Sequence, residues 1–147
     1  MRKSIVAVVL AIAMLGVGAA AFAAETYHVN AKLTPGADVP KPKGAAGAAG
    51  SFTGTYVENT KGAVLRWTLS FSKLTGPALQ AHIHLGKVGV SGNVIVPLCA
   101  PCKNGQTGKL QIPKSVVEAM EKGQTYVNVH TKKNLPGEIR GQVKVTG

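Results

Sequence analysis

Two short runs of this sequence alternate strictly in character: Gln80-Ala81-His82-Ile83-His84 and Tyr126-Val127-Asn128-Val129-His130-Thr131. Such alternation is typical of β-strands, in which successive side chains point to opposite faces. We therefore expect His82 and His84 to share one face of a strand. Tyr126, Asn128 and His130 should likewise share one face of another.

Three of the four histidines of the chain stand in these two runs, which makes them candidate metal ligands. Two residues of strand advance about 6.6 Å, and the imidazoles of His82 and His84 can both bend onto one ion at bonds of about 2.0 Å. His130, from a neighbouring strand, would complete a three-histidine site. The all-imidazole set and the affinity series favour copper over other divalent ions. Alternatively, all three side chains are hydrogen-bonded to the backbone and hold no metal.

The N-terminus has the composition of a secretory signal peptide. A basic start is followed by an almost wholly apolar run over residues 4–20 and then by small residues that a signal peptidase reads. We expect cleavage after Ala23, which makes residues 1–23 the signal peptide. Residues 24–147 then form a single domain, secreted or periplasmic, with no membrane span after cleavage. An uncleaved membrane anchor is the alternative, because the apolar run is nearly long enough to cross a bilayer.

The charge of the chain narrows the class of its partners. The formal net charge is +11, and removal of Arg2 and Lys3 with the signal peptide leaves +9. Export argues against nucleic acid as a partner. The positive net charge favours, as partners, an anionic envelope surface, an exported protein, or small anions that are steered towards a site. Scattered solvated lysines explain the charge equally well, because only Lys132 and Lys133 are adjacent.

Further alternating runs, separated by turn residues, predict an all-β fold. We expect strands near residues 26–33, 52–56, 65–71, 93–98, 108–112 and 138–145, beside the two histidine runs, and a long loop over residues 35–50. Residues 113–122 are the one helical candidate. The economical fold is an antiparallel Greek-key β-sandwich with one short helix. Trp67 is expected to be a packing anchor, and His28 falls among the polar residues of its strand.

Cys99 and Cys102 are the only cysteines of the chain. Outside the cytoplasm such a pair should be oxidised to a disulfide. The loop that it closes is small, so the chain-entropy model gives a contribution of about 2 kcal/mol. Haem attachment needs a histidine directly after the second cysteine, where Lys103 stands. Two alternatives stay open: a thioredoxin-like pair, which would need a βαβ setting, and thiolate binding of copper, which would need reduced cysteines.

Four motifs together resemble the chordin-type (CHRD) domain. They are Ala81-His82-Ile83-His84, Gly92-Asn93-Val94, the run from Gly123 through Tyr126 to Thr131, and Pro136-Gly137-Glu138-Ile139-Arg140-Gly141-Gln142. The resemblance spans about Tyr27 to Val145, and the combination of the last two motifs is quite specific. That family occurs in extracellular chordins and in many exported microbial proteins. The resemblance therefore implies fold and location more than a particular activity.

A more distant likeness is to copper,zinc superoxide dismutase, where a His-x-His strand and a later Val-His strand supply copper ligands on a Greek-key sandwich. This likeness implies an immunoglobulin-like or superoxide-dismutase-like sandwich, with His82, His84 and His130 as ligands. It also implies that Arg140 guides an anionic substrate. No histidine lies between His84 and His130, so the bridging histidine and the zinc-binding loop have no counterparts. Any metal here should be a single copper ion, or weakly bound zinc.

Three classes of function follow. The favoured one is an exported CHRD-domain binding protein that holds a single copper ion through three histidines, without chemistry of its own. A superoxide-dismutase-like copper enzyme is the first alternative, with Arg140 and nearby lysines drawing in the anion. The missing bridging histidine counts against it, because the likeness would use that residue to deliver a proton. A structural or adhesive envelope module, with incidental histidines, is the second alternative.

Overall fold

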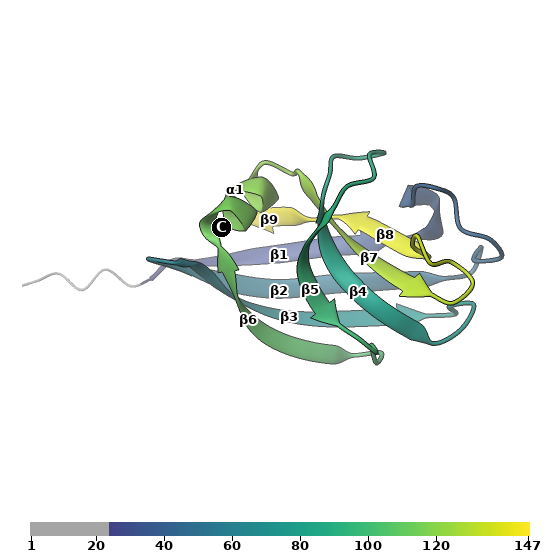
Figure 1. The fold of residues 1–147 in the computed structure, drawn as a ribbon. Helices are drawn as coiled ribbons and strands as arrows, with labels where there is room; N and C mark the ends of the chain where they lie inside the picture. Colours follow the sequence, from purple (N-terminus) through teal and green to yellow (C-terminus); the bar gives the residue numbers. More distant parts are fainter. Residues whose placement is uncertain (1–23) are drawn as a thin grey trace, which may run out of the picture.

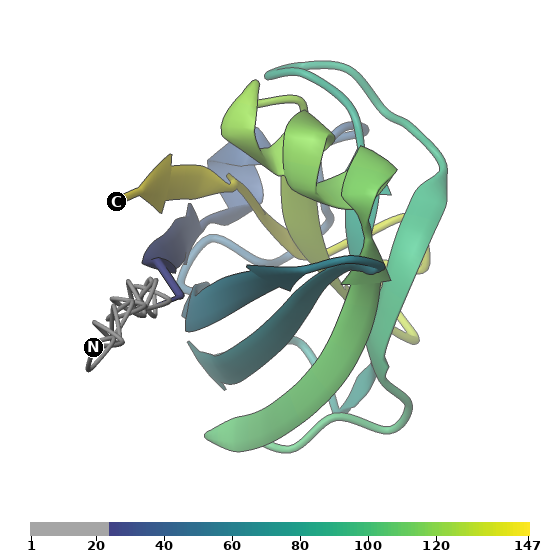
Figure 2. The ribbon, with the colours of Figure 1, turned by 90° about the vertical axis from the view of Figure 1, so that its left-hand side faces the viewer.

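The chain forms two antiparallel β-sheets that pack face to face, with one short α-helix across one end (Figures 1 and 2). The computed structural model describes residues 24–147, and the predicted signal peptide lies outside the described residues. The prediction of an all-β sandwich with one short helix is confirmed. In the described part, no helix is long and apolar enough to cross a membrane.

The five-stranded sheet supplies one half of the core. Its order is β6 (Gln106–Pro113), β3 (Gly62–Ser72), β2 (Ala49–Asn59), β1 (Thr26–Leu33) and β9 (Lys144–Thr146). Strands β1, β2 and β3 form a meander of consecutive antiparallel neighbours. Alternate side chains of each strand point into the sandwich, and the fully buried ones include Leu33, Phe52, Leu65 and Leu69.

The four-stranded sheet supplies the other half and carries both histidine runs. Its order is β5 (Val94–Cys99), β4 (Ala78–Leu85), β7 (Thr125–Thr131) and β8 (Ile139–Gln142). The chain changes sheet after β3, β5, β6 and β8, so strands distant in sequence become neighbours. One such pair is β4 with β7, in which His82 lies opposite Asn128. This pairing brings the two histidine runs side by side.

Helix α1 (Lys114–Glu121) packs against β3, β6 and β9. Its apolar side chains recur at helical spacing, and Val116, Val117 and Met120 are buried. Pro113 stands at the N-cap, and Gly123 follows the helix with a φ of 64°, a left-handed conformation that glycine adopts without steric cost. The predicted helix over residues 113–122 is therefore confirmed, one residue shorter at each end.

The prediction of one continuous strand over residues 138–145 is wrong. The segment forms two strands in different sheets, because β8 pairs with β7 whereas β9 pairs with β1. The chain crosses the sandwich at Val143, which is buried and whose N–H donates to the carbonyl of Thr125 at 3.0 Å. The alternation of apolar residues continues through the crossing, because Val143 enters the same core as Ile139.

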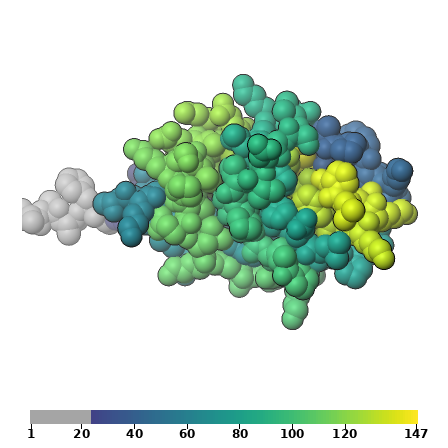
Figure 3. Space-filling view, viewed as in Figure 1, coloured from purple at the N-terminus to yellow at the C-terminus, as the bar shows by residue number. Residues whose placement is uncertain are grey.

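Three loops cover the face of the four-stranded sheet that points away from the core. They span residues 34–48, including the short 3-10 helix η1 (Pro35–Ala37), residues 86–93, and residues 132–138. Figure 3 shows atoms of these loops, in blue, teal and yellow, adjoining on the side seen in Figure 1. As a result β7 is buried along its whole length. Its aliphatic side chains lie in the core, and its polar ones lie beneath the loops.

Candidate metal centre

The side chains of His82 and His84 from β4 and His130 from β7 converge beneath these loops. Each offers a ring nitrogen, and the three nitrogens lie within 4.8 Å of one another. The ring centroids are 5.1 Å apart for His82 and His130, 5.6 Å for His82 and His84, and 5.8 Å for His84 and His130. The β4–β5 pairing shifts register before His82 and again before His84, and such bulges re-aim side chains. The tertiary structure thus brings together all three predicted ligands.

Backbone carbonyls fix the ring orientation of two of these histidines. Nδ1 of His84 donates to the carbonyl of Gly92 at 2.9 Å, and Nδ1 of His130 donates to the carbonyl of Leu135 at 2.8 Å. A carbonyl oxygen can only accept, so Nδ1 carries the proton in both rings and Nε2 presents a lone pair. Nε2 of His84 is buried and has no hydrogen-bond partner among residues 24–147. Metal-binding histidines characteristically have such carbonyl partners behind the ring.

The third histidine already lies at the spacing that an ion would require. Nδ1 of His82 donates a hydrogen bond to Nε2 of His130 at 3.2 Å, because the proton of the neutral His130 ring is on Nδ1. Two nitrogens bonded to one tetrahedral zinc-like ion at about 2.05 Å are about 3.3 Å apart. The three ligand nitrogens lie within 4.8 Å of one another, a wider limit than the spacing of about 3.3 Å at one ion. His82, the least buried of the three, or His84 would therefore rotate slightly to bring all three nitrogens within bonding distance of one ion.

Burial keeps all three imidazoles neutral. It lowers the pKa of His84 and of His130, and it is the largest cause of the lowering of the pKa of His82 to about 4, with smaller contributions from the two neighbouring histidines. Neutral imidazole is the form that binds a metal. At neutral pH the nitrogens that face inward at His84 and His130 therefore carry no proton. Nδ1 of His82 donates to Nε2 of His130, and this proton would move to Nε2 of His82 when a metal binds.

Tyr126 links the cluster to the side chain of Arg140. The His84 ring stacks on the Tyr126 ring with a centroid distance of 4.8 Å and an interplanar angle of 11°. The guanidinium carbon of Arg140 lies 3.4 Å from the centroid of the same ring, a cation–π contact. The Tyr126 hydroxyl accepts a hydrogen bond from the N–H of Gly92 at 3.0 Å. Tyr126 therefore supports the loop whose carbonyl orients His84.

Arg140 is an interior residue. Its side chain is 1% exposed, and Nη2 donates to the carbonyl of Lys87 at 2.9 Å. Nη1 is buried without a hydrogen-bond partner in the described part of the chain. The resemblance to superoxide dismutase implied a guide for anions, which requires access to solvent. In this fold Arg140 instead stabilises the loop over residues 86–93 and the stack on Tyr126.

Two buried carboxyl groups near the site, of Asp38 and Glu138, are not indicated by any pattern in the sequence. Asp38 is 1% exposed, and burial raises its pKa, although its Oδ1 accepts hydrogen bonds from the N–H of Val39 and from Nδ2 of Asn128 at 2.8 and 3.3 Å. Asp38 lies in a loop without hydrophobic periodicity, so the sequence pattern gives no indication that its side chain is buried. The one available signal is that Asp38 is the only aspartate of the chain.

Glu138 organises the turn that carries the carbonyl of Leu135. Its carboxylate accepts hydrogen bonds from the N–H of Thr75 at 2.6 Å and from Nδ2 of Asn134 at 3.0 Å, and from the hydroxyls of Thr75 and Thr131. Burial would raise the pKa of Glu138, but these hydrogen bonds outweigh burial and hold it below its usual value. The motif over residues 136–142 contains Glu138, but the role of this residue depends on partners such as Thr75, which is far away in sequence.

The remaining candidates behave as packing or surface residues. Cys99 and Cys102 form a disulfide, as predicted, so neither sulfur is a thiolate ligand in this fold. Trp67 is 4% exposed and its ring lies 6.2 Å from that of Phe52, in agreement with a packing anchor. His28 is exposed on the five-stranded sheet and does not belong to the histidine cluster.

Comparisons with known proteins place this site within a family. The sequence model of the CHRD domain matches residues 29–143, a range that contains both histidine strands and all three covering loops. No curated protein and no solved structure matches the chain.

Proposed function

This chain belongs to the CHRD domain family, and we propose that it is an exported binding protein that holds a single copper ion through His82, His84 and His130. One observation carries the proposal. Three neutral imidazoles have nitrogens within 4.8 Å of one another, and two of the rings are oriented by backbone carbonyls. Structural histidines would be expected to use both ring nitrogens in hydrogen bonds, whereas Nε2 of His84 is buried and unused within residues 24–147.

The donor set supports copper as the metal. Within the described residues, the clustered ligand atoms come from histidines alone. Imidazole suits both copper and zinc, and copper lies above zinc in the affinity series of divalent ions. Zinc is therefore the competitor against which selectivity must be measured.

The proposal of export rests on two features. Residues 1–23 have the composition of a signal peptide, so the mature protein would begin at Ala24. The Cys99–Cys102 disulfide persists in oxidising compartments, such as the periplasm or the medium.

The surroundings of the histidines support binding rather than turnover. Superoxide dismutation would need an accessible cation to draw in the anion, whereas Arg140 is 1% exposed and bound to the carbonyl of Lys87. The chain also offers no fourth histidine near the cluster to deliver a proton, because His28 lies elsewhere.

Copper titration of the mature protein tests the proposal. We expect one equivalent to bind tightly, as Cu(I) or Cu(II), against competition from zinc. The double variant His82→Ala/His84→Ala should lose this equivalent, whereas the matched control His28→Ala should retain it. Absence of specific binding by the wild-type protein, or retention of the equivalent by the double variant, would refute the three-histidine site.

A further inference from the structure

The face of the five-stranded sheet that points away from the core carries two cross-strand rows of polar side chains. One row runs across all five strands as Thr146, His28, Thr55, Arg66 and Lys109, each directly opposite the next. We call the surface formed by this row and its neighbour the basic face. Every side chain in the first row except Thr55 is exposed.

The neighbouring row has the same character. It runs as Lys144, Asn30, Thr53, Thr68 and Thr107, again with each residue opposite the next. Neither of these described rows contains an acidic side chain, and their only charges are positive. The basic face therefore combines a lattice of hydroxyl groups with uncompensated cations.

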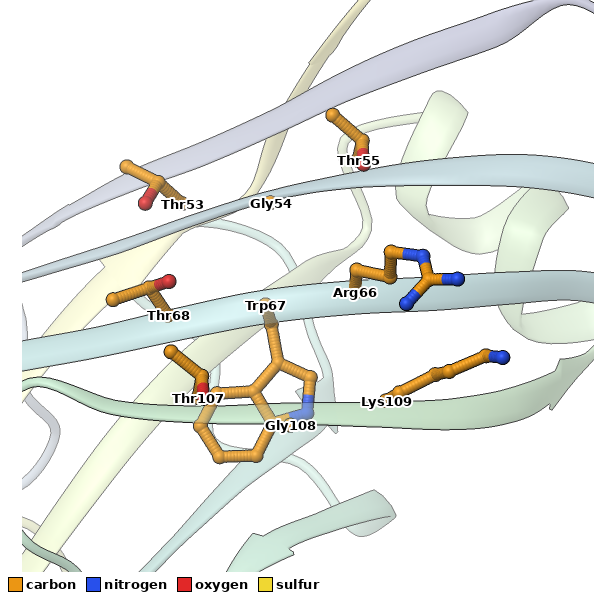
Figure 4. Close-up of a pocket in the computed structure, with 9 residues that line it drawn as sticks. All are labelled: Thr53, Gly54, Thr55, Arg66, Trp67, Thr68, Thr107, Gly108 and Lys109. Atoms are coloured by element: carbon orange, nitrogen blue, oxygen red, sulfur yellow. The ribbon is translucent and has the colours of Figure 1, made fainter.

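Arg66 and Lys109 form the centre of the positive charge. They lie directly opposite each other on β3 and β6, and Figure 4 shows both side chains extending in the same direction. Like charges in directly opposed positions destabilise a sheet. The other cross-strand neighbour of Arg66 is Thr55, which cannot neutralise the charge. An anion between the two cations would remove this repulsion.

The surface of the sheet around Arg66 and Lys109 is concave. A depression of about 620 Å³ lies over β2, β3 and β6, and its lining includes Arg66, Lys109 and the hydroxyl groups of Thr55 and Thr68 (Figure 4). Guanidinium donates paired hydrogen bonds to carboxylate, sulfate or phosphate, and threonine hydroxyls both donate and accept. The lining thus matches a ligand that bears acidic groups and hydroxyl groups together.

We propose that the basic face binds an anionic polysaccharide, whose carboxylate or sulfate groups pair with Arg66 and Lys109 and whose hydroxyl groups bond to the threonines. Neither row contains a Phe, Tyr or Trp side chain for stacking with the bases of a single-stranded nucleic acid, and Trp67, which also lines the depression, is only 4% exposed. Neither row contains a large apolar side chain, which would enter a lipid surface. A hydrated acidic polymer fits this surface best.

This inference does not depend on the metal site. The histidine cluster belongs to the outward face of the four-stranded sheet, and the basic face belongs to that of the five-stranded sheet, on opposite sides of the sandwich. The protein could hold its metal on one side while it adheres to a polymer on the other. Failure of either proposal leaves the other intact.

The test measures binding of the mature protein to alginate, which carries carboxylates, to dextran sulfate, and to uncharged dextran. We expect binding to one or both acidic polymers, weakening with salt, and none to dextran. Arg66→Ser/Lys109→Ser should weaken binding at least about tenfold, because charge-assisted hydrogen bonds are lost. Preference for alginate or dextran sulfate would identify the acidic group. Thr68→Val should weaken binding without a change of charge.

The control removes the same charge elsewhere. Lys87→Ser/Lys122→Ser alters two exposed lysines outside both rows and should leave affinity nearly unchanged. Equal losses in the two double variants would mean that net charge alone drives binding and would overturn the proposal. Absence of binding to either acidic polymer, or stronger binding to anionic lipid vesicles through Arg66 and Lys109, would overturn it as well. Melting temperatures of all variants verify that each is folded.

Discussion

The side chain of Asn134 holds the backbone of Lys43 through two hydrogen bonds. The N–H of Lys43 donates to Oδ1 at 2.7 Å, and Nδ2 donates to the carbonyl of Lys43 at 3.2 Å. Nδ2 also donates to Glu138. One buried amide thereby joins the loop over residues 34–48 to the turn over residues 132–138, and the histidine cluster lies beneath both.

Asn134→Ala should lower the free energy of unfolding by about 2–3 kcal/mol, because it leaves several buried groups without partners. Urea denaturation measures the change. Asn59→Ala is the matched control, since this exposed amide bonds to Gln111 and to a turn, and its loss should be about 1 kcal/mol or less. Equal losses in the two variants would contradict the joining role of Asn134.

Removal of the Tyr126 hydroxyl should weaken metal binding without abolishing it. In Tyr126→Phe the N–H of Gly92 loses its acceptor, and the carbonyl that orients His84 becomes less constrained. Loss of such outer partners reduces metal affinity about 10- to 100-fold. Competition titrations with copper measure this, with Tyr27→Phe, whose hydroxyl bonds to Glu25 at the surface, as the control. Unchanged affinity would mean that the 86–93 loop does not support the site.

Arg140→Ala should destabilise the fold by about 2–4 kcal/mol, because it removes a buried cation–π contact and a charge-assisted hydrogen bond. Thermal unfolding measures the effect. We expect no superoxide consumption by the wild-type protein beyond that of free copper. An activity that Arg140→Ala slows while copper stays bound would instead favour the enzyme alternative.

Acidification should destabilise the protein through Glu138 and through the clustered histidines His82, His84 and His130. Burial lowers the pKa of His82 from 6.5 to about 4, so between these values the unfolded chain takes up a proton that the folded chain excludes. Stability should therefore fall as the pH drops from about 6.5 to about 4. The hydrogen bonds to Glu138 contribute stability that is present above pH 4.5 and is lost as the pH falls through its lowered pKa.

Urea denaturation over this pH range measures the loss. His82→Asn should reduce the loss of stability between pH 6.5 and 4, and the part that remains belongs to His84 and His130, whose pKa values burial also lowers. Glu138→Gln should reduce the loss below pH 4.5. His28→Asn, at an exposed position, should change neither. Constant stability of the wild-type protein from pH 7 to pH 4 would show that the fold does not protect the clustered histidines from protonation.

Removal of the disulfide should cost about 2 kcal/mol, since it closes a loop of only a few residues. Cys99→Ser/Cys102→Ser should keep full copper stoichiometry, because His82, His84 and His130 supply the ligands. A variant that folds but binds less copper would assign the sulfurs to the site and would revive the thiolate alternative.

Much of the strand assignment could be predicted, because one face of each strand is buried and period-two alternation follows. Residues 26–33 behave in this way. Residues 125–131 are buried on both faces, but their side chains still alternate in character, because the aliphatic ones lie in the core and the polar ones lie beneath the loops. The break between β8 and β9 could not be predicted, since Val143 enters the same core from the crossing point. Alternating apolar residues indicate that one face of the chain is buried, but they do not indicate to which of the two sheets the segment belongs.

Local sequence by itself determined that His82 and His84 lie two residues apart on an alternating strand, and that Cys99 and Cys102 are close enough to bond. Only the tertiary structure decided that His130 joins them, because this requires β4 to pair with β7, more than forty residues away in the chain. The carbonyls of Gly92 and Leu135 belong to loops with no periodicity of their own. The positions of these carbonyls follow from packing and from contacts between residues distant in sequence, such as Asn134 and Lys43. No local sequence pattern indicates such contacts.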